Sequence, residues 1–365
     1  MRIIIVGAGI AGLCIARSAL DCGHTVTVLE QDRIPHPNSA SYDEHRLIRY
    51  QYGAAEGYAR MVGDAFAAWE RLWQDLGARH FADSGVLSIS LAKGDYADTS
   101  LATLQRSRLP HEVLGSAATQ RLCPQLDVPD HATGLLCHPG GALFADRIVR
   151  DLVKHVGDQG AELLAQTEVV AVDDAEATVR TRHGATLEGD LVVIAAGAWL
   201  DKLLPAEYAG LPVQRQMLCY IRAPQDHIAY WANGPALCVL GDNNVYTLPP
   251  RDGTGLKFGC GALRQSLGPE HGFEADMDRG RKVIEAFRPF LHREVDYQTV
   301  RGKVGYYVMD AERRFKLQRR NRRVVVTNCD GQMFKFGPLL GERIMAAIDG
   351  RESFEATARW MGGYL

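Results

Sequence analysis

Hydrophobic residues occur along this chain in two patterns, short continuous runs and repeats at helical spacing. Apolar runs at residues 2–6 and 25–29 predict two buried strands, and the stretch of small apolar residues at 13–22 between them predicts a helix. The clearest helical repeat, with apolar residues three and four positions apart, predicts a helix over 57–79. Further helices are predicted at residues 146–160, 276–290 and 338–348 and over most of 101–125.

The remaining strands are predicted from short apolar runs bounded by Gly, Pro, Asn or Asp. They lie at residues 85–90, 167–172, 178–181, 191–195, 214–222, 236–240, 245–248, 256–260 and 323–327. The runs between 213 and 260 follow one another closely, which predicts an antiparallel sheet. The strands that end near residues 6, 195 and 327 instead run into glycine turns, and we assign all three to one domain.

The first of these turns carries the sequence G-A-G-I-A-G at residues 7–12. Inside a strand–helix–strand unit, this G-x-G-x-x-G pattern is typical of an adenine dinucleotide site. Gly7 permits the tight turn, Gly9 lets the backbone approach a pyrophosphate, and Gly12 allows the helix and strand to pack closely. The N–H groups at the start of the helix would hold the phosphates, and Glu30 would accept hydrogen bonds from a ribose.

The predicted fold is α/β, of the α+β two-domain kind. It combines a Rossmann-type nucleotide-binding domain with a discontinuous substrate domain built on a mainly antiparallel sheet. We expect the nucleotide-binding domain to comprise residues 1–80, 143–212 and 300–365, and the substrate domain to comprise 81–142 and 213–299. A chain of 365 residues is long enough for two such cores.

Composition and charge restrict the classes of partner. Apolar residues make up 46% and charged residues 23% of the chain, as in ordinary globular proteins, and a net charge of −3 provides no general attraction to nucleic acid or membrane. No apolar run approaches the roughly eighteen residues of a membrane span, and the first strand begins directly after Met1, so we expect neither a span nor a signal peptide. The eight cysteines lack metal-ligand spacing, which favours free thiols in the cytoplasm.

Three polar segments are interpreted as parts of the structure rather than as functional sites. Seven Lys and Arg fall within residues 313–323, and because they lie between predicted strands we expect a solvated hairpin rather than a nucleic-acid site. Neither Cys137-His138 nor Asp43-Glu44-His45 has further ligands at metal-site spacing, and we interpret the latter as ordinary loop residues.

Five segments carry a family resemblance. They lie at residues 7–12, 46–53 (R-L-I-R-Y-Q-Y-G), 197–204 (with G-A-W and K-L-L), 255–259 (G-L-K-F-G) and 334–342 (with F-K-F and G-E). In this order the chain resembles the glycine, sarcosine and D-amino-acid oxidase superfamily of FAD enzymes, most closely its monomeric sarcosine oxidase and N-methyltryptophan oxidase branch. The resemblance spans nearly the whole chain and implies an FAD-binding domain with a sheet-based substrate domain over the flavin.

The resemblance implies roles for four cationic residues. Arg46 would lie against the flavin, while Arg49 and Lys335 would bind the substrate carboxylate, a task for which an arginine fork is suited. Lys257 would lie beside the flavin and stabilise the negative charge that develops when oxygen accepts electrons. Taken without the resemblance, the same residues read as two surface arginines, a lysine stem between aromatic rings and a water-facing lysine on a strand.

The resemblance also implies non-covalent FAD, because the relatives' flavin-linking cysteine corresponds to Gly305. A histidine of the relatives corresponds to Gly261, which would leave room near the substrate amine. Arg264 would then reach a second acidic group, with a solvent-exposed arginine as the alternative, and Tyr307 completes the expected substrate site. The helix starting near Pro338 would direct its N-terminus at the flavin. The remaining expected cofactor contacts are Gly7, Gly9, Ile10, Ala11, Gly12, Glu30, Gln31, Leu47, Val169, Gly197, Trp199, Met333, Phe334 and Lys335.

The resemblance therefore predicts an FAD-dependent oxidase of a secondary amine or N-substituted amino acid, sarcosine-like or iminodiacetate-like. Hydride transfer to the flavin would give an imine that water hydrolyses, and reoxidation by O2 would yield H2O2. The alternatives are a dehydrogenase that passes electrons to a carrier, an oxidase of a primary or cyclic amino acid, an NAD(P)H-dependent hydroxylating enzyme and a non-catalytic nucleotide-binding protein. The expected partners are the small-molecule amine and O2, without nucleic acid or membrane, and a monomer is favoured.

Overall fold

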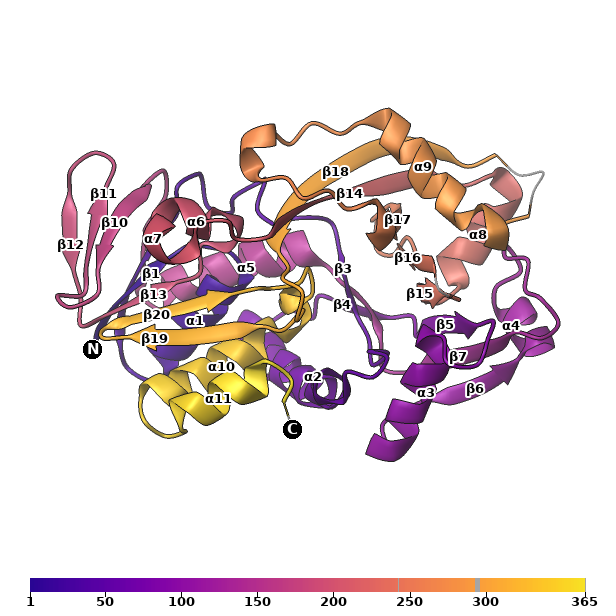
Figure 1. Ribbon diagram of the computed structural model, residues 1–365, viewed down its shortest axis with the longest axis horizontal. Coiled ribbons are helices and arrows are strands. Elements are labelled where there is room, and N and C mark those ends of the chain that lie inside the picture. The colour runs from indigo at the N-terminus through magenta and orange to yellow at the C-terminus, as the bar shows by residue number, and fades with distance from the viewer. Residues whose placement is uncertain (242, 293–295, 365) are drawn as a thin grey trace.

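The computed structural model describes residues 1–241, 243–292 and 296–364, and Figure 1 shows them as two lobes lying side by side. One lobe contains a six-stranded sheet whose strands are β1 (Arg2–Val6), β2 (Thr25–Leu29), β9 (Glu162–Leu164), β13 (Leu191–Ile194), β19 (Lys316–Arg320) and β20 (Arg323–Thr327). Their order is β19-β20-β13-β1-β2-β9. All pairs are parallel except β19 with β20, so the carboxyl ends of five strands meet at one edge.

Helices cover this sheet because their apolar faces have to be buried against it. They are α1 (Ile10–Asp21), α2 (Glu56–Leu76), α5 (Ala145–Asp158), α10 (Gly337–Ile348) and α11 (Phe354–Met361). Leu13 and Ile15 of α1 are fully buried and share one core with Ile3 and Ile5 of β1. A Cβ built on Gly341 would lie 2.4 Å from the Cys14 carbonyl oxygen, so only glycine lets α10 approach α1 this closely.

The other lobe contains an eight-stranded sheet. Its strands are β5 (Val86–Ser90), β6 (Glu112–Gly115), β7 (Thr133–Cys137), β14 (Val213–Arg222), β15 (Ala236–Leu240), β16 (Asn243–Leu248), β17 (Leu256–Cys260) and β18 (Gln298–Val308). Their order is β18-β14-β17-β16-β15-β5-β7-β6, antiparallel except for β15 with β5. The predicted α/β fold with a Rossmann-type sheet and a mainly antiparallel second sheet is confirmed.

The second lobe has its own core. Helices α8 (Gln225–Asn233) and α9 (Met277–Phe287) lie along the sheet, and α3 (Tyr96–Ser107) and α4 (Ser116–Leu122) lie beside β5, β6 and β7 (Figure 1). Phe258 of β17 stacks on Phe287 of α9, with ring centroids 4.2 Å apart, and meets the edge of Trp231 from α8. These aromatic contacts bury the face of the sheet opposite the cavity-lining side chains of β17.

Smaller elements complete the chain. Two three-stranded antiparallel sheets consist of β3 (Arg46–Ile48), β8 (Gly141–Leu143) and β4 (Phe81–Asp83), and of β10 (Val169–Asp173), β11 (Thr178–Thr181) and β12 (Thr186–Glu188). The short helices are η1 (Gly197–Trp199), α6 (Leu200–Leu203), α7 (Pro205–Tyr208), η2 (Gly261–Leu263), η3 (Pro269–His271), η4 (Arg288–Phe290) and η5 (Met333–Phe336). Of these, β3, η1 and η5 carry residues expected to bind the cofactor or substrate.

Three local predictions need correction. Residues 101–125 are not mostly helical, because β6 interrupts them and pairs with β7, a long-range contact that local propensity does not reveal. The helix over 338–348 is not the last, since α11 follows and Ser353 caps it by accepting a hydrogen bond from the Ala356 N–H. The basic run does form the predicted hairpin, β19 with β20, but Arg323 is buried and paired with Glu207 rather than solvated.

Candidate functional site

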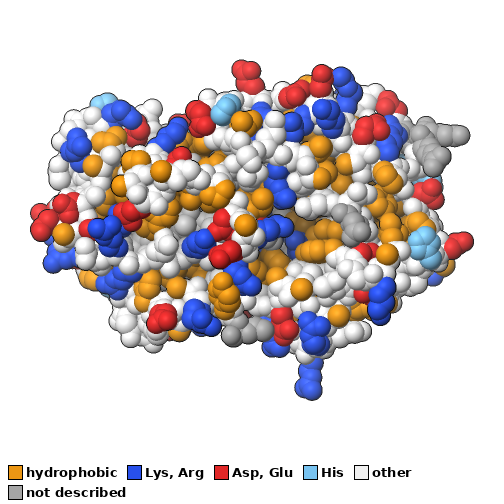
Figure 2. All heavy atoms as spheres, viewed as in Figure 1, with side chains coloured by type: hydrophobic (Ala, Val, Ile, Leu, Met, Phe, Trp, Pro, Cys, Tyr) orange, Lys and Arg blue, Asp and Glu red, His pale blue; other side chains and the backbone are white. Residues whose placement is uncertain are grey.

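A cavity of about 590 Å³ lies between the two lobes and is lined by residues of both sheets. Figure 2 shows a hollow on this face of the molecule, with Lys and Arg side chains gathered at it. The lining residues come from five regions that the sequence analysis singled out, represented by Gly9, Arg49, Trp199, Lys257 and Lys335. Four of these regions are more than thirty positions from the next, so only the tertiary fold brings them together. The cavity is large enough to be a cofactor and substrate site.

One end of the cavity is formed by the glycine turn between β1 and α1. Gly7 has a φ of +109°, and a Cβ there would lie 2.5 Å from the Ala195 carbonyl oxygen; a Cβ on Gly12 would lie 1.9 Å from the Gly7 carbonyl oxygen. Both positions therefore require glycine. The N–H of Ile10, in the first turn of α1, donates to the Ser41 hydroxyl at 2.9 Å. Backbone donors at a helix N-terminus with a hydroxyl beside them suit a pyrophosphate.

Glu30, Gln31 and Val169 line the same end of the cavity. The Glu30 carboxylate accepts a hydrogen bond from the Ala8 N–H at 2.9 Å and is held against the glycine turn. Burial raises the pKa of Glu30, and the backbone donors oppose that rise. A buried acceptor at the tip of β2 next to the glycine turn is the arrangement that binds the ribose of an adenine dinucleotide. The residues present thus fit the adenosine diphosphate part of FAD.

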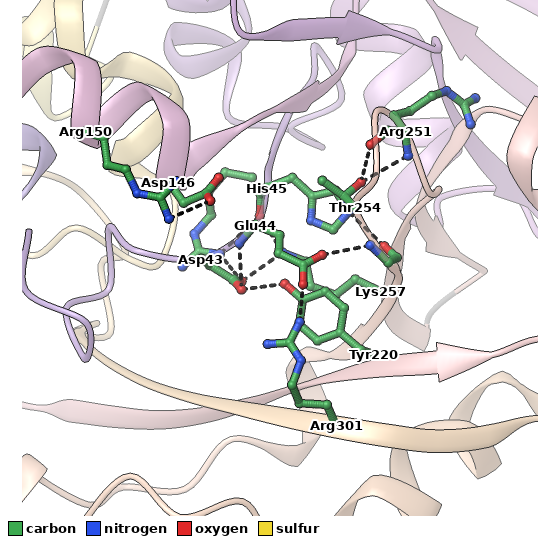
Figure 3. A network of polar contacts seen from close by, with 12 residues as sticks. Asp43, Glu44, His45, Asp146, Arg150, Tyr220, Arg251, Thr254, Lys257 and Arg301 are labelled. Carbon is green, nitrogen blue, oxygen red and sulfur yellow. Dashed lines mark hydrogen bonds and ion pairs between the residues drawn. The ribbon is translucent and has the colours of Figure 1, made fainter.

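An ionic network centred on Asp43 lies beside the cavity (Figure 3), and its members Arg46 and Lys257 line the cavity. The Lys257 ammonium lies 2.9 Å from Asp43 Oδ2 and also donates to the His45 carbonyl oxygen. Arg46 pairs with the same carboxylate, which accepts a further hydrogen bond from the Tyr220 hydroxyl. Lys257 is 1% exposed and Asp43 5%, so the water-facing interpretation of Lys257 is excluded. Lys257 lines the cavity, whereas Asp43 does not and instead pairs with the lining residues Lys257 and Arg46.

This network sets the charges of its members. Burial lowers the pKa of Lys257 to about 8, and the neighbouring Asp43 limits the fall. Lys257 and Arg46 together hold the pKa of Asp43 well below its usual range, against the opposing effect of burial. At neutral pH the cluster therefore contains one anion and two cations, and one positive charge is left in excess next to the cavity.

Arg49 and Lys335 come together on either side of Tyr52. Arg49 follows β3 and donates to the Tyr96 hydroxyl at 2.9 Å, with its guanidinium 4.5 Å from the centre of the Tyr52 ring. Lys335, in η5, lies 3.0 Å from the Tyr52 hydroxyl. Burial lowers the pKa of Lys335 strongly, and the charge of Arg49 lowers it further. Within the three described ranges neither side chain forms an ion pair, so the structure holds two neighbouring basic groups without an acidic partner.

The cavity is also lined by Gly261, Arg264, Gly305, Tyr246 and Tyr307. A Cβ built on Gly305 meets no atom within 4 Å, so the backbone leaves open space there. Burial raises the pKa of Tyr307 to about 12, and the charge of the nearby Arg264 opposes that rise. Arg264 lines the cavity near Tyr307 and is half-buried.

The cysteine environment differs from what sequence distance suggested. Cys329 and Cys238 both line the cavity although they are far from Gly305 in the chain. Burial raises the pKa of Cys329 to about 11 and also raises that of Cys238. Both thiols are therefore protonated at neutral pH, which makes them poor nucleophiles towards a flavin.

The described part of the chain contains neither a cluster of metal ligands nor a membrane-spanning helix. No group of three or more His, Cys, Asp or Glu side chains within it is arranged to hold a metal ion. No helix described there is both long and apolar enough to cross a membrane.

The structure adds site residues that sequence reasoning missed. Asp43 was interpreted as an ordinary loop residue, yet it joins Arg46 to Lys257, which lies 214 positions further along the chain. Tyr52 and Tyr96, which hold Lys335 and Arg49, were not considered at all. Of these two tyrosines, only Tyr52 could have been identified from the sequence, because it falls within the R-L-I-R-Y-Q-Y-G segment.

Comparison with known proteins agrees with this geometry. The model of a family described as FAD dependent oxidoreductase matches residues 2–347. N-methyl-L-tryptophan oxidases of Yersinia pestis (strain Pestoides F) and Yersinia pseudotuberculosis (serotype O:1b, strain IP 31758) are each 28% identical over 350 residues, covering 93% of this chain and 92% of theirs.

Among solved structures, the open form of NikD, an unusual amino acid oxidase essential for nikkomycin biosynthesis, superimposes with a TM-score of 0.80 at 22% identity over 96% of this chain and 94% of that one. L-proline dehydrogenase from P. horikoshii superimposes with a TM-score of 0.82 at 19% identity over 100% of this chain and 98% of that one. At these identities the two likenesses establish the shared fold.

Proposed function

Because the chain belongs to the family of FAD-dependent oxidoreductases, we propose that it is an oxidase of amino acids substituted on nitrogen, whether sarcosine-like or iminodiacetate-like. The observation that carries this proposal is the pair of cations at Tyr52. Arg49 and Lys335 are held in one cavity with the glycine turn, and neither forms an ion pair within the described ranges. Two neighbouring positive charges are stabilised when an anionic ligand binds to both of them.

The residues that would hold FAD are distributed along the cavity. The turn at residues 7–12 and Glu30 suit the adenosine diphosphate, while Arg46, Trp199 and η5 lie where the ring would be. When bound, FAD supplies the acceptor for a hydride equivalent from the carbon next to the substrate nitrogen. The amine thereby becomes an imine, which water hydrolyses to an amine and a carbonyl compound, and O2 takes up the two electrons with two protons to give H2O2.

Arg49 and Lys335 provide orientation. A carboxylate bound by an arginine fork and an ammonium group loses its rotational freedom, which fixes the neighbouring carbon in one position. The same two cations disfavour a further positive charge nearby, so they lower the pKa of a bound substrate ammonium and favour the neutral amine. Only the neutral amine has the nitrogen lone pair that stabilises the positive charge left on the carbon as the hydride departs.

Lys257 favours the oxidase over the dehydrogenase alternative. It is a buried cation at the cavity, and a fixed positive charge stabilises the anion formed when oxygen accepts an electron. Asp43 supports this role because the carboxylate counteracts the effect of burial on the Lys257 pKa. An enzyme that delivers electrons to a carrier protein has no need of this charge.

The test is an anaerobic screen of the FAD-loaded protein against N-alkyl amino acids, primary amino acids and cyclic imino acids. We expect N-alkyl amino acids to bleach the flavin absorbance fastest, and we expect H2O2 on admission of air. Faster bleaching by primary or cyclic amino acids would assign the other substrate classes. Turnover with a dye but without peroxide would assign the dehydrogenase.

A further inference from the structure

A third cavity cation, Arg264, has no ion pair among residues 1–241, 243–292 and 296–364. Of the other arginines that the structure places along the cavity, all except Arg49 have an acidic partner. Arg46 pairs with Asp43, and Arg313 lies 3.1 Å from Asp330, whose side chain is 1% exposed. An unpaired guanidinium beside neutralised ones, facing a cavity rather than bulk water, is the arrangement expected where a ligand supplies the anion.

Arg264 and Arg49 both line the cavity. It interacts with Tyr307, and Tyr307 in turn lies in the field of Arg313. Arg313 also acts on Tyr96, whose hydroxyl receives the hydrogen bond from Arg49. Arg264 is thus connected to Arg49 through Tyr307, Arg313 and Tyr96, of which Tyr307 and Arg313 line the cavity.

The backbone leaves room in the cavity next to Tyr307. Gly305 lies beside Tyr307 on β18, and a Cβ built there meets nothing within 4 Å. Gly261 lies three residues before Arg264, and a Cβ there would come within 2.3 Å of Asn244 Nδ2, so a side chain would displace Asn244 and change this part of the cavity. Gly305 therefore leaves open space, whereas at Gly261 the Asn244 side chain fills the space that the sequence comparison predicted to be free.

We infer that the substrate carries a second acidic group, which Arg264 binds while Arg49 and Lys335 bind the first. The class is a dicarboxylic amine, with its second carboxylate on the nitrogen substituent or on the side chain. This inference rests on the proposed function, because it takes the first carboxylate to be bound at Tyr52. An apolar or aromatic substituent would leave the Arg264 charge unpaired in the complex.

Glutarate and butyrate form a matched pair of probes that cannot be oxidised. Glutarate is iminodiacetate with a methylene in place of the nitrogen, and butyrate is the corresponding analogue of sarcosine with one carboxylate. We expect the FAD-loaded protein to bind glutarate about 10- to 100-fold more tightly than butyrate, measured by the change in the flavin absorbance spectrum. In Arg264→Gln this advantage should disappear while butyrate affinity stays the same, and Arg264→Lys should retain part of it.

Arg222→Gln is the matched control, because Arg222 is exposed at the end of β14 and does not line the cavity. It removes an equal charge and should leave the preference for glutarate intact. Equal affinities in the native protein, or a preference that survives in Arg264→Gln, would overturn the inference. If sarcosine bleaches the flavin anaerobically but glutarate has no advantage, only this inference fails. If no amine bleaches the flavin, the proposed function fails with it.

Discussion

Replacing Asp43 by Asn removes the carboxylate that pairs with Lys257 while retaining its shape and its capacity to accept from Tyr220. Lys257 would then be a buried lysine next to the positive charge of Arg46, which lowers its pKa. A lysine is charged below its pKa and neutral above it. The rate of reaction with O2, if it depends on the Lys257 charge, therefore falls as the pH rises through this pKa.

The size of the shift follows from the ion-pair distance. Opposite charges 2.9 Å apart interact by about 6 kcal/mol at an effective dielectric constant of about 20. At about 1.4 kcal/mol per pH unit, this energy corresponds to a pKa shift of about 4 units. We expect about half of this shift, because Lys257 still donates to the His45 carbonyl oxygen and water enters the site. The pKa of Lys257, about 8 in the native protein, would then fall to about 6. At pH 7 the charged fraction would drop from about nine-tenths to about one-tenth, and the oxygen rate constant about tenfold.

The assay is stopped-flow reoxidation of the anaerobically reduced protein, across a pH series that brackets both pKa values. Tyr220→Phe is the matched control, because it removes a hydrogen bond to Asp43 but keeps the carboxylate, and its profile should remain near the native one. Removing one partner of a buried ion pair costs about 3–5 kcal/mol of stability, so FAD content and anaerobic reduction must be normal before the rates are compared. An Asp43→Asn profile with the native midpoint would refute the reasoning.

Three further predictions test other parts of the site. Arg49→Ala should raise the apparent KM at least tenfold with FAD still bound, because it removes a charged partner of the carboxylate; unchanged kinetics would remove Arg49 from the substrate site. Lys257→Met should slow reoxidation by O2 in stopped-flow measurements and leave anaerobic reduction nearly intact; equal losses in both half-reactions would contradict its role. Acid precipitation should release the flavin into the supernatant, since the cavity thiols Cys329 and Cys238 are protonated; yellow colour in the pellet would indicate a covalent bond.

The nucleotide end of the site was predictable because its determinants are local. The strand, the glycine turn, the helix and the second strand follow one another within 29 residues, and each glycine has a steric reason that the structure makes visible. Gly12 lies so near the Gly7 carbonyl that no other residue fits. Patterns of this kind depend on residues that are close together in the chain, so the spacing of residues in the sequence predicts them well.

The substrate end was predictable only in part, because its determinants are long-range. Arg49 and Lys335 were singled out by family resemblance, but the tyrosine between them was not. Asp43 belongs to a loop with no periodicity, and its partner lies on a strand of the other lobe. β6 illustrates the same limit for the fold, since its four residues become a strand only by pairing with β7.

The central claim is that Arg49 and Lys335 hold an anionic amine in place for oxidation, and the most direct measurement compares two amines under anaerobic conditions. Sarcosine and dimethylamine share the N-methyl group, and only the first has a carboxylate. In stopped-flow experiments with the FAD-loaded protein, we predict that sarcosine or its dicarboxylic analogue bleaches the flavin, whereas dimethylamine does so at least a hundredfold more slowly at equal concentration. Equal bleaching by dimethylamine, or no bleaching by any carboxylate-bearing amine, would contradict the account.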